Sequence, residues 1–253
     1  MKFQLTKGHN IQIAGVPKRE IVSSGNLEKV ALKPSEFRGI KPKLLVKKGE
    51  SVKTGQPLFF DKKNPDVSFA SPGCGAVSAI NYGPKRIINS IEITLKGNES
   101  IQHESVRSHE IYSLDRGAII SKILAGGLWP VIKQRPFNAI ADPKATPRAI
   151  FISGYNSAPL TVDLDLALSE QTGPFQTGLN VLRRMTDGYV HLTVPEGTVS
   201  ETLVNAEGVR IHYVKGPHPA GNVGIQIHHI DPLNPGETIW TISAQHVVTL
   251  GSF

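Results

Sequence analysis

The sequence is poor in cysteine and has no long apolar run. Its 253 residues include a single cysteine, Cys74, which excludes an internal disulfide, a zinc cage of cysteines and a four-cysteine iron–sulfur site. No stretch approaches the roughly 18 consecutive apolar residues that a membrane span needs. Residues 1–15 are polar and lack the apolar core of a signal peptide. These absences predict a soluble, intracellular chain in a reducing compartment.

Aromatic residues are also few, at 6% of the chain, and charged residues make up only 19%. Hydrophobic residues reach 39%, and 24 glycines stand beside them. This composition is typical of a globular protein with a sizeable core and not of a disordered one. A chain of this length forms one large domain or two modest ones.

The positive charge is concentrated in the first part of the chain. Residues 1–100 hold 17 Lys and Arg against 8 Asp and Glu, a balance of +9, whereas residues 101–253 hold 11 against 13. The basic part favours an acidic partner subunit or an anionic membrane surface, although scattered lysines also keep a small β domain in solution. Nucleic acid is not expected as a partner, because the sequence has no dense basic run and no helix-turn-helix pattern.

A β-rich region extends from Lys29 to Leu95. Its short apolar alternations are broken by Gly, Pro and Asn, and helical periodicity is absent. This spacing predicts a small, tight sandwich of strands. The polar run that follows, to about residue 113, indicates a connector, and we place a boundary near residue 100. The predicted division is an N-terminal segment 1–28, a β domain 29–100 and a second domain 101–253.

The hydrophobic period changes after this boundary. A helix is expected to begin at a cap on Ser113 and to end at Gly126-Gly127, and a second helix is expected over 174–188. Strands are predicted at 149–153, as a buried central strand, and at 190–194 and 209–214, with a short helix at 201–205. This alternation indicates a mainly parallel α/β layer. The last segments, 225–230 and 238–250, are expected to return to β structure.

Two half-units in the β region resemble the biotinyl/lipoyl carrier fold, a barrel-sandwich hybrid. The first half reads Val46-x-x-Gly49-x-x-Val52-x-x-Gly55-x-x-Leu58, and the second contains Ser71-Pro72 and Gly75-x-Val77. The glycines suit turns that need positive φ. A carrier presents one lysine at a hairpin tip, and Lys62 and Lys63 stand at the matching turn. Pro65 disturbs that turn, so we expect a carrier-like fold used as an adaptor, and a carrier modified on Lys62 or Lys63 remains the alternative.

Motifs for other chemistry are missing or weak. The sequence has no phosphate-binding glycine loop between a strand and a helix. Four histidines gather near the end of the chain, with Asp231 close by: His212, His218, His228 and His229. Neighbouring side chains of a strand point to opposite faces, so this is weak metal spacing. A metal-dependent hydrolase that uses His218, His228 and Asp231 stays open as a third interpretation.

Two segments resemble one known family. They are Gly126-Gly127-Leu128-Trp129-Pro130, followed by Arg135-Pro136-Phe137, and 216–224, which leads into 227–232. Both look like the A subunit of the Na⁺-translocating NADH:quinone oxidoreductases, the NqrA family, and the resemblance covers the whole chain. More distant relatives are the C subunit of Rnf complexes and the flavin-binding NADH subunit of complex I.

The resemblance implies a peripheral subunit on the cytoplasmic face of the bacterial inner membrane, in a complex that passes electrons from NADH to quinone and exports sodium. Its partners would be the other subunits, especially a membrane subunit. No redox cofactor of its own is expected, because Leu128 and Trp129 would fill the space that a flavin needs. The family's chain continues into further C-terminal domains, so the sequence corresponds to its N-terminal portion. The expected fold class is α/β plus β: a barrel-sandwich hybrid followed by a Rossmann-like α/β domain.

A quinone or ligand pocket is predicted from five residues near these motifs. The aromatic side chains of Trp129, Phe137 and Tyr155 would supply flat walls, and Arg135 and His218 would donate hydrogen bonds to a quinone carbonyl. The competing interpretation is that the aromatic residues beside proline are packing anchors, and that the prolines around His218 only stiffen a loop. No catalytic residue and no metal ligand is assigned.

Overall fold

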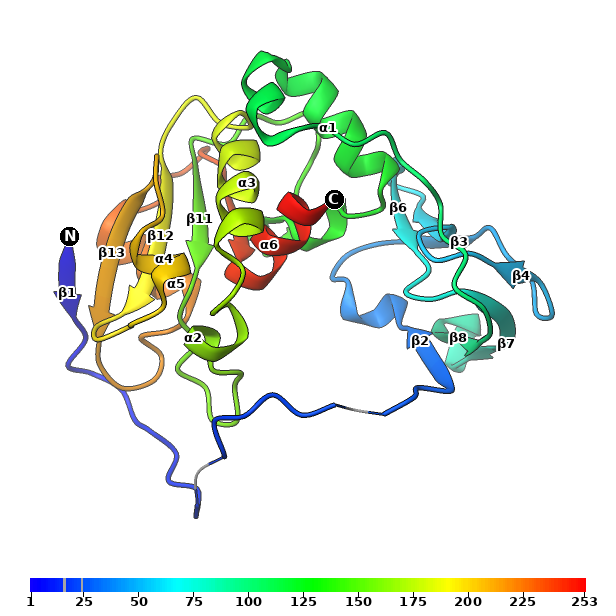
Figure 1. The fold of residues 1–253 in the computed structure, drawn as a ribbon, viewed down its shortest axis with the longest axis horizontal. Helices are drawn as coiled ribbons and strands as arrows, with labels where there is room; N and C mark the ends of the chain where they lie inside the picture. The colour runs from blue at the N-terminus through cyan, green and yellow to red at the C-terminus, as the bar shows by residue number, and fades with distance from the viewer. Residues whose placement is uncertain (16, 24) are drawn as a thin grey trace.

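The computed structural model describes residues 1–15, 17–23 and 25–253 of the chain. It consists of two lobes (Figure 1). A β lobe contains two small sheets, and an α/β lobe contains one seven-stranded sheet with helices on its faces. Among the described residues, no helix is both long and apolar enough to cross a membrane.

The β lobe confirms the predicted sandwich of short strands. One sheet has the order β2-β8-β7-β4 and the other the order β3-β5-β6. Phe59 and Phe69 stack at 4.3 Å between ring centroids and are both fully buried between the sheets. The strands are β2 (Lys29–Leu32), β3 (Pro42–Leu44), β4 (Ser51–Val52), β5 (Pro57–Asp61), β6 (Asn64–Ala70), β7 (Gly75–Tyr82) and β8 (Ile88–Leu95), with 3-10 turns η1 (Pro34–Glu36) and η2 (Pro84–Arg86).

Glycines of the repeated motif occupy turns, as expected. Gly49 has φ +88° and Gly55 has φ +85°, conformations that residues with a side chain rarely adopt. Gly75 is required for a different reason, because a Cβ at this position would collide with the carbonyl oxygen of Thr94 on the paired strand. The motif therefore sets both the turns of this lobe and the close approach of β7 to β8.

The N-terminal segment belongs to the other lobe. Strand β1 (Lys2–Gln4) pairs in parallel with β13 (Arg210–Lys215), more than 200 residues later in the chain. The described residues between β1 and β2 lie beneath the molecule and have no regular secondary structure (Figure 1). They are held there by a hydrogen bond from the His9 N–H to the His218 carbonyl, at 2.9 Å, and by an ion pair of 2.8 Å between Arg19 and Asp163. Residues 1–28 thus connect the two lobes.

The α/β lobe is built on a sheet of order β1-β13-β12-β11-β14-β9-β10. The first five strands are parallel, β9 is antiparallel to β14, and β10 is antiparallel to β9, so β9 alone runs against the other six strands. The other elements are η3 (Ser108–Ser113), α1 (Arg116–Ala125), η4 (Trp129–Val131), β9 (Lys133–Arg135), β10 (Ala139–Ile140), β11 (Ala149–Ser153), α2 (Leu164–Ala167), α3 (Thr172–Arg183), β12 (Val190–Pro195), α4 (Glu201–Val204), α5 (Val223–Ile230), β14 (Ile239–Ser243) and α6 (Ala244–Ser252).

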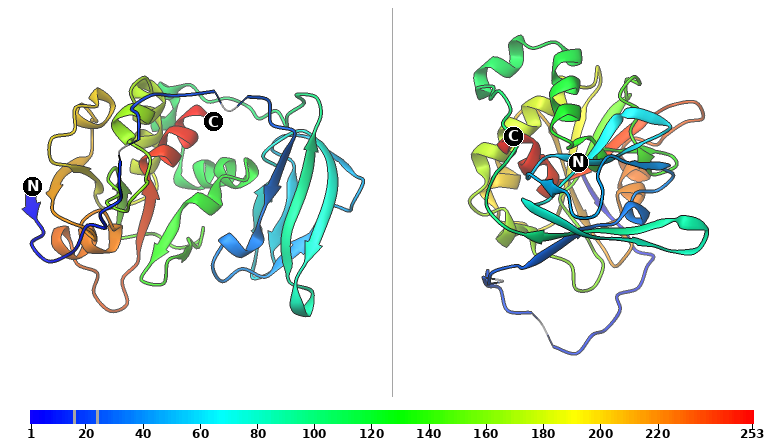
Figure 2. Two further views of the ribbon diagram at one scale, coloured as in Figure 1. Left: turned by 90° about the horizontal axis from the view of Figure 1, so that it is seen from below. Right: turned by 90° about the vertical axis from the view of Figure 1, so that its right-hand side faces the viewer.

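Helices cover both faces of this sheet. Alternate residues of β11 face opposite sides: Ile150 and Ile152 belong to the main core with α3 and α6, whereas Phe151 packs with Ile227 of α5. The figures show α3 and α6 together on one side (Figures 1 and 2). The predicted central strand at 149–153 is confirmed, because β11 lies fourth of seven. The strands predicted near 190–194 and 209–214 and the short helix near 201–205 are also confirmed.

The last predicted β segments are wrong in most of their length. Residues 225–230 lie in helix α5, and only the start of 238–250 is a strand, since α6 begins at Ala244. Two isoleucines two residues apart, Ile225 and Ile227, imitate the strand period, and the valines at 247–248 favour β structure locally. Tertiary packing prevails, because Ala244, Val247 and Leu250 lie on one helical face that is buried against α3.

Helix boundaries differ by a few residues from the expected ones. The N-cap of α1 is Asp115, which accepts a 2.7 Å hydrogen bond from the Ala118 N–H, whereas the Ser113 hydroxyl donates to the Glu110 carbonyl in η3. The predicted stop at Gly126-Gly127 is confirmed. The helix expected over 174–188 begins two residues earlier and ends at Arg183.

The lobes meet where the end of α1 and η4 contact β6. Gly127 lies so close to Ala70 that a Cβ would approach the alanine methyl group within 2.7 Å. The Lys133 ammonium lies 5.2 Å from the centre of the Phe37 ring, across the same junction. The main hydrophobic cluster is continuous and contains buried residues of both lobes. The division at residues 28 and 100 stays a prediction.

Candidate functional site

The most developed candidate site is a crevice at the carboxyl ends of β11 and β14. In chain order the strands β11, β12, β13 and β14 take the spatial order 3-2-1-4, so the direction of winding reverses between β11 and β14. Ligands of open α/β sheets bind outside the carboxyl ends of the strands at such a reversal. A cavity of about 610 Å³ lies at this point.

Two cations from β9 line one side of this crevice. Lys133 and Arg135 are two residues apart on a strand, so they share a face, and β9 pairs with β14. Burial lowers the pKa of both groups below the usual value. The Lys133 ammonium donates a 2.7 Å hydrogen bond to the Pro130 carbonyl, and the Arg135 Nε is buried without a partner. Two incompletely satisfied cations therefore face the crevice.

Hydroxyl groups and a histidine line the end of the sheet itself. The Ser153 hydroxyl donates a 2.9 Å hydrogen bond to the Tyr155 carbonyl, and Ser243 lies 3.0 Å from His246 Nδ1. Burial raises the pKa of the Tyr155 phenol, which stays protonated and able to donate. Burial, and secondarily the charge of Lys133, lower the pKa of His246. The crevice thus presents neutral donors and acceptors beside its two cations.

His218 fixes a loop and does not line the crevice. Ser157 accepts a 2.8 Å hydrogen bond from the Gly221 N–H, and its own hydroxyl lies 3.0 Å from His218 Nδ1. Gly221 packs against the backbone of residues 156–157 with no room for a Cβ. This network holds the loop that leads into α5, whose first residues do line the crevice.

The other two predicted pocket residues lie elsewhere. Trp129 is fully buried, donates a 2.7 Å hydrogen bond to the Ala141 carbonyl and contacts Trp240 edge to face at 5.4 Å. Phe137 is 77% exposed in the turn between β9 and β10. Of the five residues, the structure brings Arg135 and Tyr155 together in the crevice, whereas Trp129, Phe137 and His218 stay outside it.

Sequence reasoning missed three crevice residues: Lys133, Ser243 and His246. The alternation of Lys133 and Arg135 was a usable signal, because cations at i and i+2 of a strand share a face. Ser243 and His246 were hidden by the prediction of a strand over 238–250, which placed the start of α6 inside a sheet.

The remaining histidines do not form the metal site of the third interpretation. Asp231 makes an ion pair of 2.8 Å with Arg148, and His228 lies on helix α5, not on a strand. Within residues 1–15, 17–23 and 25–253, no three His, Cys, Asp or Glu side chains gather in a way that could hold a metal ion.

The hairpin tip expected for a carrier lysine exists. Lys62 and Lys63 form the two-residue turn between β5 and β6, and Asp61 on the preceding strand accepts hydrogen bonds from the Lys41 and Lys63 N–H groups. Both lysines are exposed, but the Lys63 ammonium donates a hydrogen bond to the Gly39 carbonyl. Lys62 is therefore the lysine whose position suits modification.

A second cavity, of about 810 Å³, lies at the amino ends of β12 and β13. His191 and His212 meet beside it, with Nδ1 and Nε2 2.9 Å apart, and both side chains are buried. The His191 ring stacks on Phe151 at 4.4 Å. Burial, more than the nearby charges, lowers the pKa of each imidazole to about 4. The pair is therefore neutral at pH 7.

Comparison with known proteins agrees with this architecture. The family model of the NqrA N-terminal barrel-sandwich hybrid domain matches residues 3–96, and that of the NqrA second alpha/beta domain matches residues 114–253. The predicted fold class, a barrel-sandwich hybrid followed by an α/β domain, is confirmed.

Curated relatives are named as the A subunit of a Na(+)-translocating NADH-quinone reductase. The relative from Yersinia pseudotuberculosis is 37% identical over 98% of this chain and 56% of its own length. Those from Serratia proteamaculans and Pseudomonas aeruginosa are 38% and 36% identical over 99% and 98% of this chain, and over 56% and 55% of their own lengths. The chain spans little more than half the length of these relatives.

Among solved structures, a chain of an NAD⁺-reducing [NiFe]-hydrogenase aligns with 58% of this chain and 32% of its own length, at 13% identity and a TM-score of 0.37. The two domain models match in their order and together account for most of the sequence. The relatives align over nearly all of this chain. The chain therefore belongs to the NqrA family.

Proposed function

We propose that this chain acts as part of the NqrA subunit of a Na⁺-translocating NADH:quinone oxidoreductase, a membrane complex that couples NADH oxidation and quinone reduction to sodium export. The observation that carries the proposal is the alignment of 98–99% of the chain with relatives of that name. The ordered match of both domain models supports the same role.

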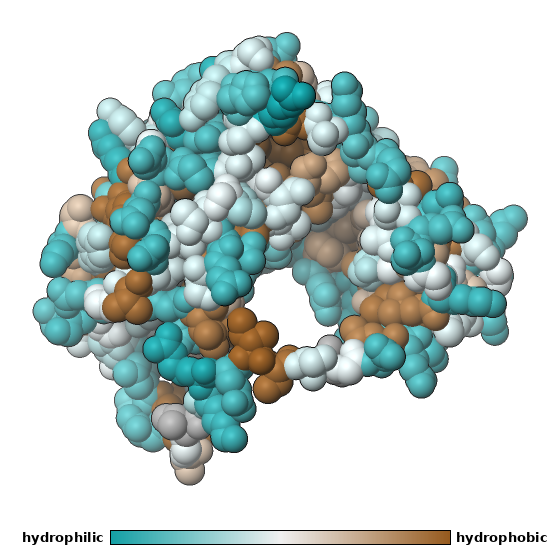
Figure 3. All heavy atoms as spheres, in the orientation of Figure 1, coloured by the Kyte–Doolittle hydropathy of each residue, from teal (hydrophilic) through white to brown (hydrophobic). Residues whose placement is uncertain are grey.

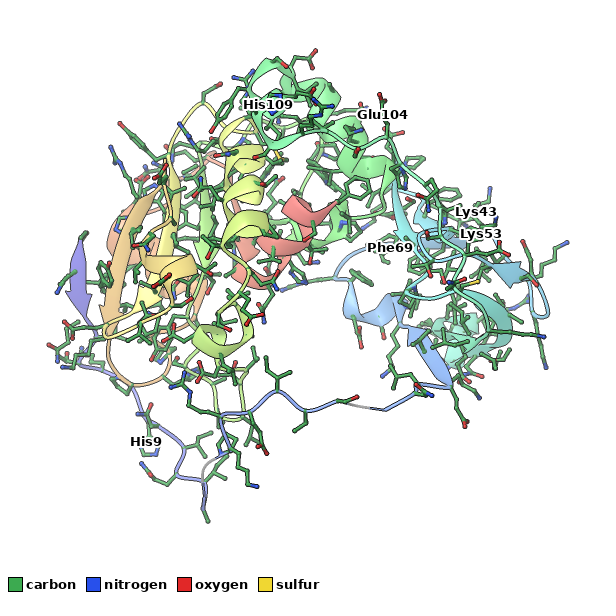
Figure 4. All side chains as sticks on the ribbon, viewed as in Figure 1. His9, Lys43, Lys53, Phe69, Glu104 and His109 are labelled. Atoms are coloured by element: carbon green, nitrogen blue, oxygen red, sulfur yellow. The ribbon has the colours of Figure 1, made fainter. Side chains whose placement is uncertain are left out.

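The proposed place of the chain is peripheral, on the cytoplasmic face of the bacterial inner membrane, where it binds the other subunits and most of all a membrane subunit. The balance of +9 in residues 1–100 supports docking of the β lobe to an acidic partner or an anionic surface. Lys43 and Lys53 are among the cations of this lobe (Figure 4). Binding of the purified protein to anionic vesicles should weaken with salt, and salt-independent binding would argue against this docking.

The chain is proposed to hold no redox cofactor of its own. Trp129 fills the core at the place where the resemblance would put the edge of a flavin, and it packs against Trp240 with its ring nitrogen satisfied. An absorbance spectrum of the purified protein tests this. A stoichiometric flavin band in the visible range would contradict it.

Quinone contact is proposed at the crevice. Its volume lies within the range of small-molecule sites, and Arg135 and Tyr155 both have donors for a quinone carbonyl. Trp129, Phe137 and His218, the other members of the predicted set, would act there only indirectly, through the core, the β9–β10 turn and the loop before α5. Titration with a water-soluble quinone should change the fluorescence of the two tryptophans, because Trp240 lies next to crevice residues of β14. An unchanged signal at saturating quinone would refute the contact.

The role in the complex is tested by removing the chain. Membranes from cells that lack it should lose sodium-dependent NADH:quinone reductase activity, and the activity should return when the gene is restored on a plasmid. Membranes that keep the full sodium-dependent activity without the chain would contradict the proposal.

A carrier protein modified on Lys62 is the second candidate function, favoured by the exposed position of this lysine at a two-residue turn. Intact mass distinguishes the two functions. A lipoyl or biotinyl arm adds a defined mass to the chain, and a Lys62→Arg variant would lose it. An unmodified mass supports the role in the complex.

A further inference from the structure

We propose that the crevice at the ends of β11 and β14 binds the phosphoryl group of a small organic phosphate, with Lys133 and Arg135 as its counter-cations. The inference stands on the crevice alone and does not require the proposed function. Quinone contact and phosphate binding are separate outcomes, because a quinone carries no phosphoryl group.

The first support is uncompensated positive charge. No carboxylate of the described chain lies within ion-pairing distance of Lys133 or Arg135. Arg148, at the amino end of β11 and thus at the other end of the same strands, is a half-buried guanidinium that the fold pairs with carboxylates. It makes ion pairs with Asp231 and Glu237 at 2.8 and 3.1 Å.

Burying a cation without a partner costs free energy, and a nearby anion offsets that cost. A half-buried cation loses hydration, and an anion restores the lost interaction. Arg135 Nε has no hydrogen-bond partner, and the Lys133 ammonium has one backbone carbonyl and the face of the Phe37 ring but no anion. Residues of the described segments that line the crevice include no Asp or Glu. An anion from outside the chain is thus the group that this charge distribution fits.

The second support is the convergence of donors around the same space. The first turn of α5 contributes Val223 and Gly224, and the start of α6 contributes Ser243 and Gln245. The N-cap residues, Asn222 of α5 and Ser243 of α6, make no side-chain hydrogen bond to the backbone of the first turn of their helices. The first backbone N–H groups of both helices therefore donate no hydrogen bond to a cap side chain. The positive ends of two helix dipoles add to the two cations.

The shape of the site favours a phosphoryl group on a larger molecule. Donors come from three separate elements, β9, α5 and α6, which suits a tetrahedral group with three free oxygens better than a flat carboxylate. The crevice also has an apolar wall that includes Val131, Val162 and Ile242. A cavity of about 610 Å³ is larger than a bare phosphate ion needs, so an organic moiety is expected to occupy the remainder.

The test is calorimetric titration of the full-length protein with ADP, with inorganic phosphate and with succinate. Saturable binding of ADP, weaker binding of phosphate and no binding of succinate are expected. Arg135→Gln and Lys133→Gln should each weaken ADP binding about tenfold or more, the loss expected of one charge-assisted contact. Lys144→Gln is the matched control, because this exposed lysine of the same lobe does not line the crevice, and it should bind ADP as the parent does.

A vesicle arm separates a soluble phosphate from a lipid headgroup. If phosphatidylglycerol vesicles compete with ADP in the parent protein but not in Arg135→Gln, the phosphoryl group of a lipid is also accepted at this site. Absence of saturable ADP binding by the unaltered protein at about 10 mM would overturn the proposal, whatever the variants do. Equal ADP affinity of the parent and both crevice variants would overturn it as well, and so would succinate binding as tight as that of ADP.

Discussion

The buried histidine pair gives the fold a measurable weakness to acid. His191 and His212 are 2% and 5% exposed, and burial lowers the pKa of each to about 4, against about 6.5 in the unfolded chain. Between these values the unfolded chain binds more protons than the folded one. The free energy of unfolding therefore falls as the pH drops from about 6.5 towards 4, and it is independent of these groups above pH 7.

The magnitude follows from the two pKa values. Between pH 8 and pH 5 one such imidazole lowers the free energy of unfolding by about 2 kcal/mol, and the pair by about 4 kcal/mol. Replacing His191 with glutamine removes one titrating group and keeps a polar side chain of similar reach. The His191→Gln variant should therefore lose about 2 kcal/mol less than the parent over this range, which separates the contribution of His191 from that of the carboxylates.

The assay is urea denaturation of parent and variant at pH 8 and pH 5, followed by far-UV circular dichroism. His109→Gln is the matched control, because His109 is exposed on η3 and lies away from β12 and β13 (Figure 4). The control should show the same pH dependence as the parent. If His191→Gln loses as much stability as the parent between pH 8 and pH 5, the argument that burial keeps this pair neutral is wrong.

Three further substitutions test the packing, each by urea denaturation. Trp129→Ala should lower the free energy of unfolding by about 3–5 kcal/mol, because it empties a fully buried site at the junction of the lobes, and a loss below about 1 kcal/mol would contradict that position. Phe137→Ala should change it by less than about 0.5 kcal/mol, because the ring is 77% exposed; a large loss would place this ring in the core. Gly178→Ala should lower the free energy of unfolding by about 1–3 kcal/mol, since a Cβ on α3 would collide with the Val247 carbonyl on α6. An unchanged free energy of unfolding would contradict this close contact between the two helices.

Exposed apolar side chains border an opening between the two lobes (Figure 3). Ile21, Val22 and Leu27 of the connecting segment are 77%, 72% and 59% exposed. Single exposed apolar residues are ordinary on protein surfaces. Three within seven residues of the segment that joins the lobes fit the proposed role in a complex, where a partner subunit would cover them.

Local rules made the β lobe and several α/β elements predictable. Gly49 and Gly55 predict turns, because residues with a side chain rarely adopt their positive φ. The apolar run at 149–153 predicts a strand that is buried on both faces. The helix that ends at Gly126-Gly127 could be read from the period of its isoleucines. The motifs around Trp129 and 216–224 led to the NqrA family, which the domain models confirm.

Elements whose partners are distant in sequence could not be read in this way. The three residues of β1 form a strand only because they pair with β13 at the edge of the sheet. Helix α5 packs on Phe151, although the spacing of its isoleucines is that of a strand. Trp129 and Phe137 both stand beside proline, yet one is buried and the other exposed, since burial depends on what the rest of the chain places around a side chain.

By itself, the sequence determined the β sandwich with its glycine turns, the alternation of strands and helices, and the family. The sandwich and the alternation depend on interactions between residues that are close in the chain, and the family depends on motifs in the amino-acid sequence. Only the tertiary structure decided that β9 lies beside β14, which carries Lys133 and Arg135 to the crevice with the starts of α5 and α6. The physical reason is that strand order and the burial of charge are set by contacts between distant segments, which local periodicity does not encode.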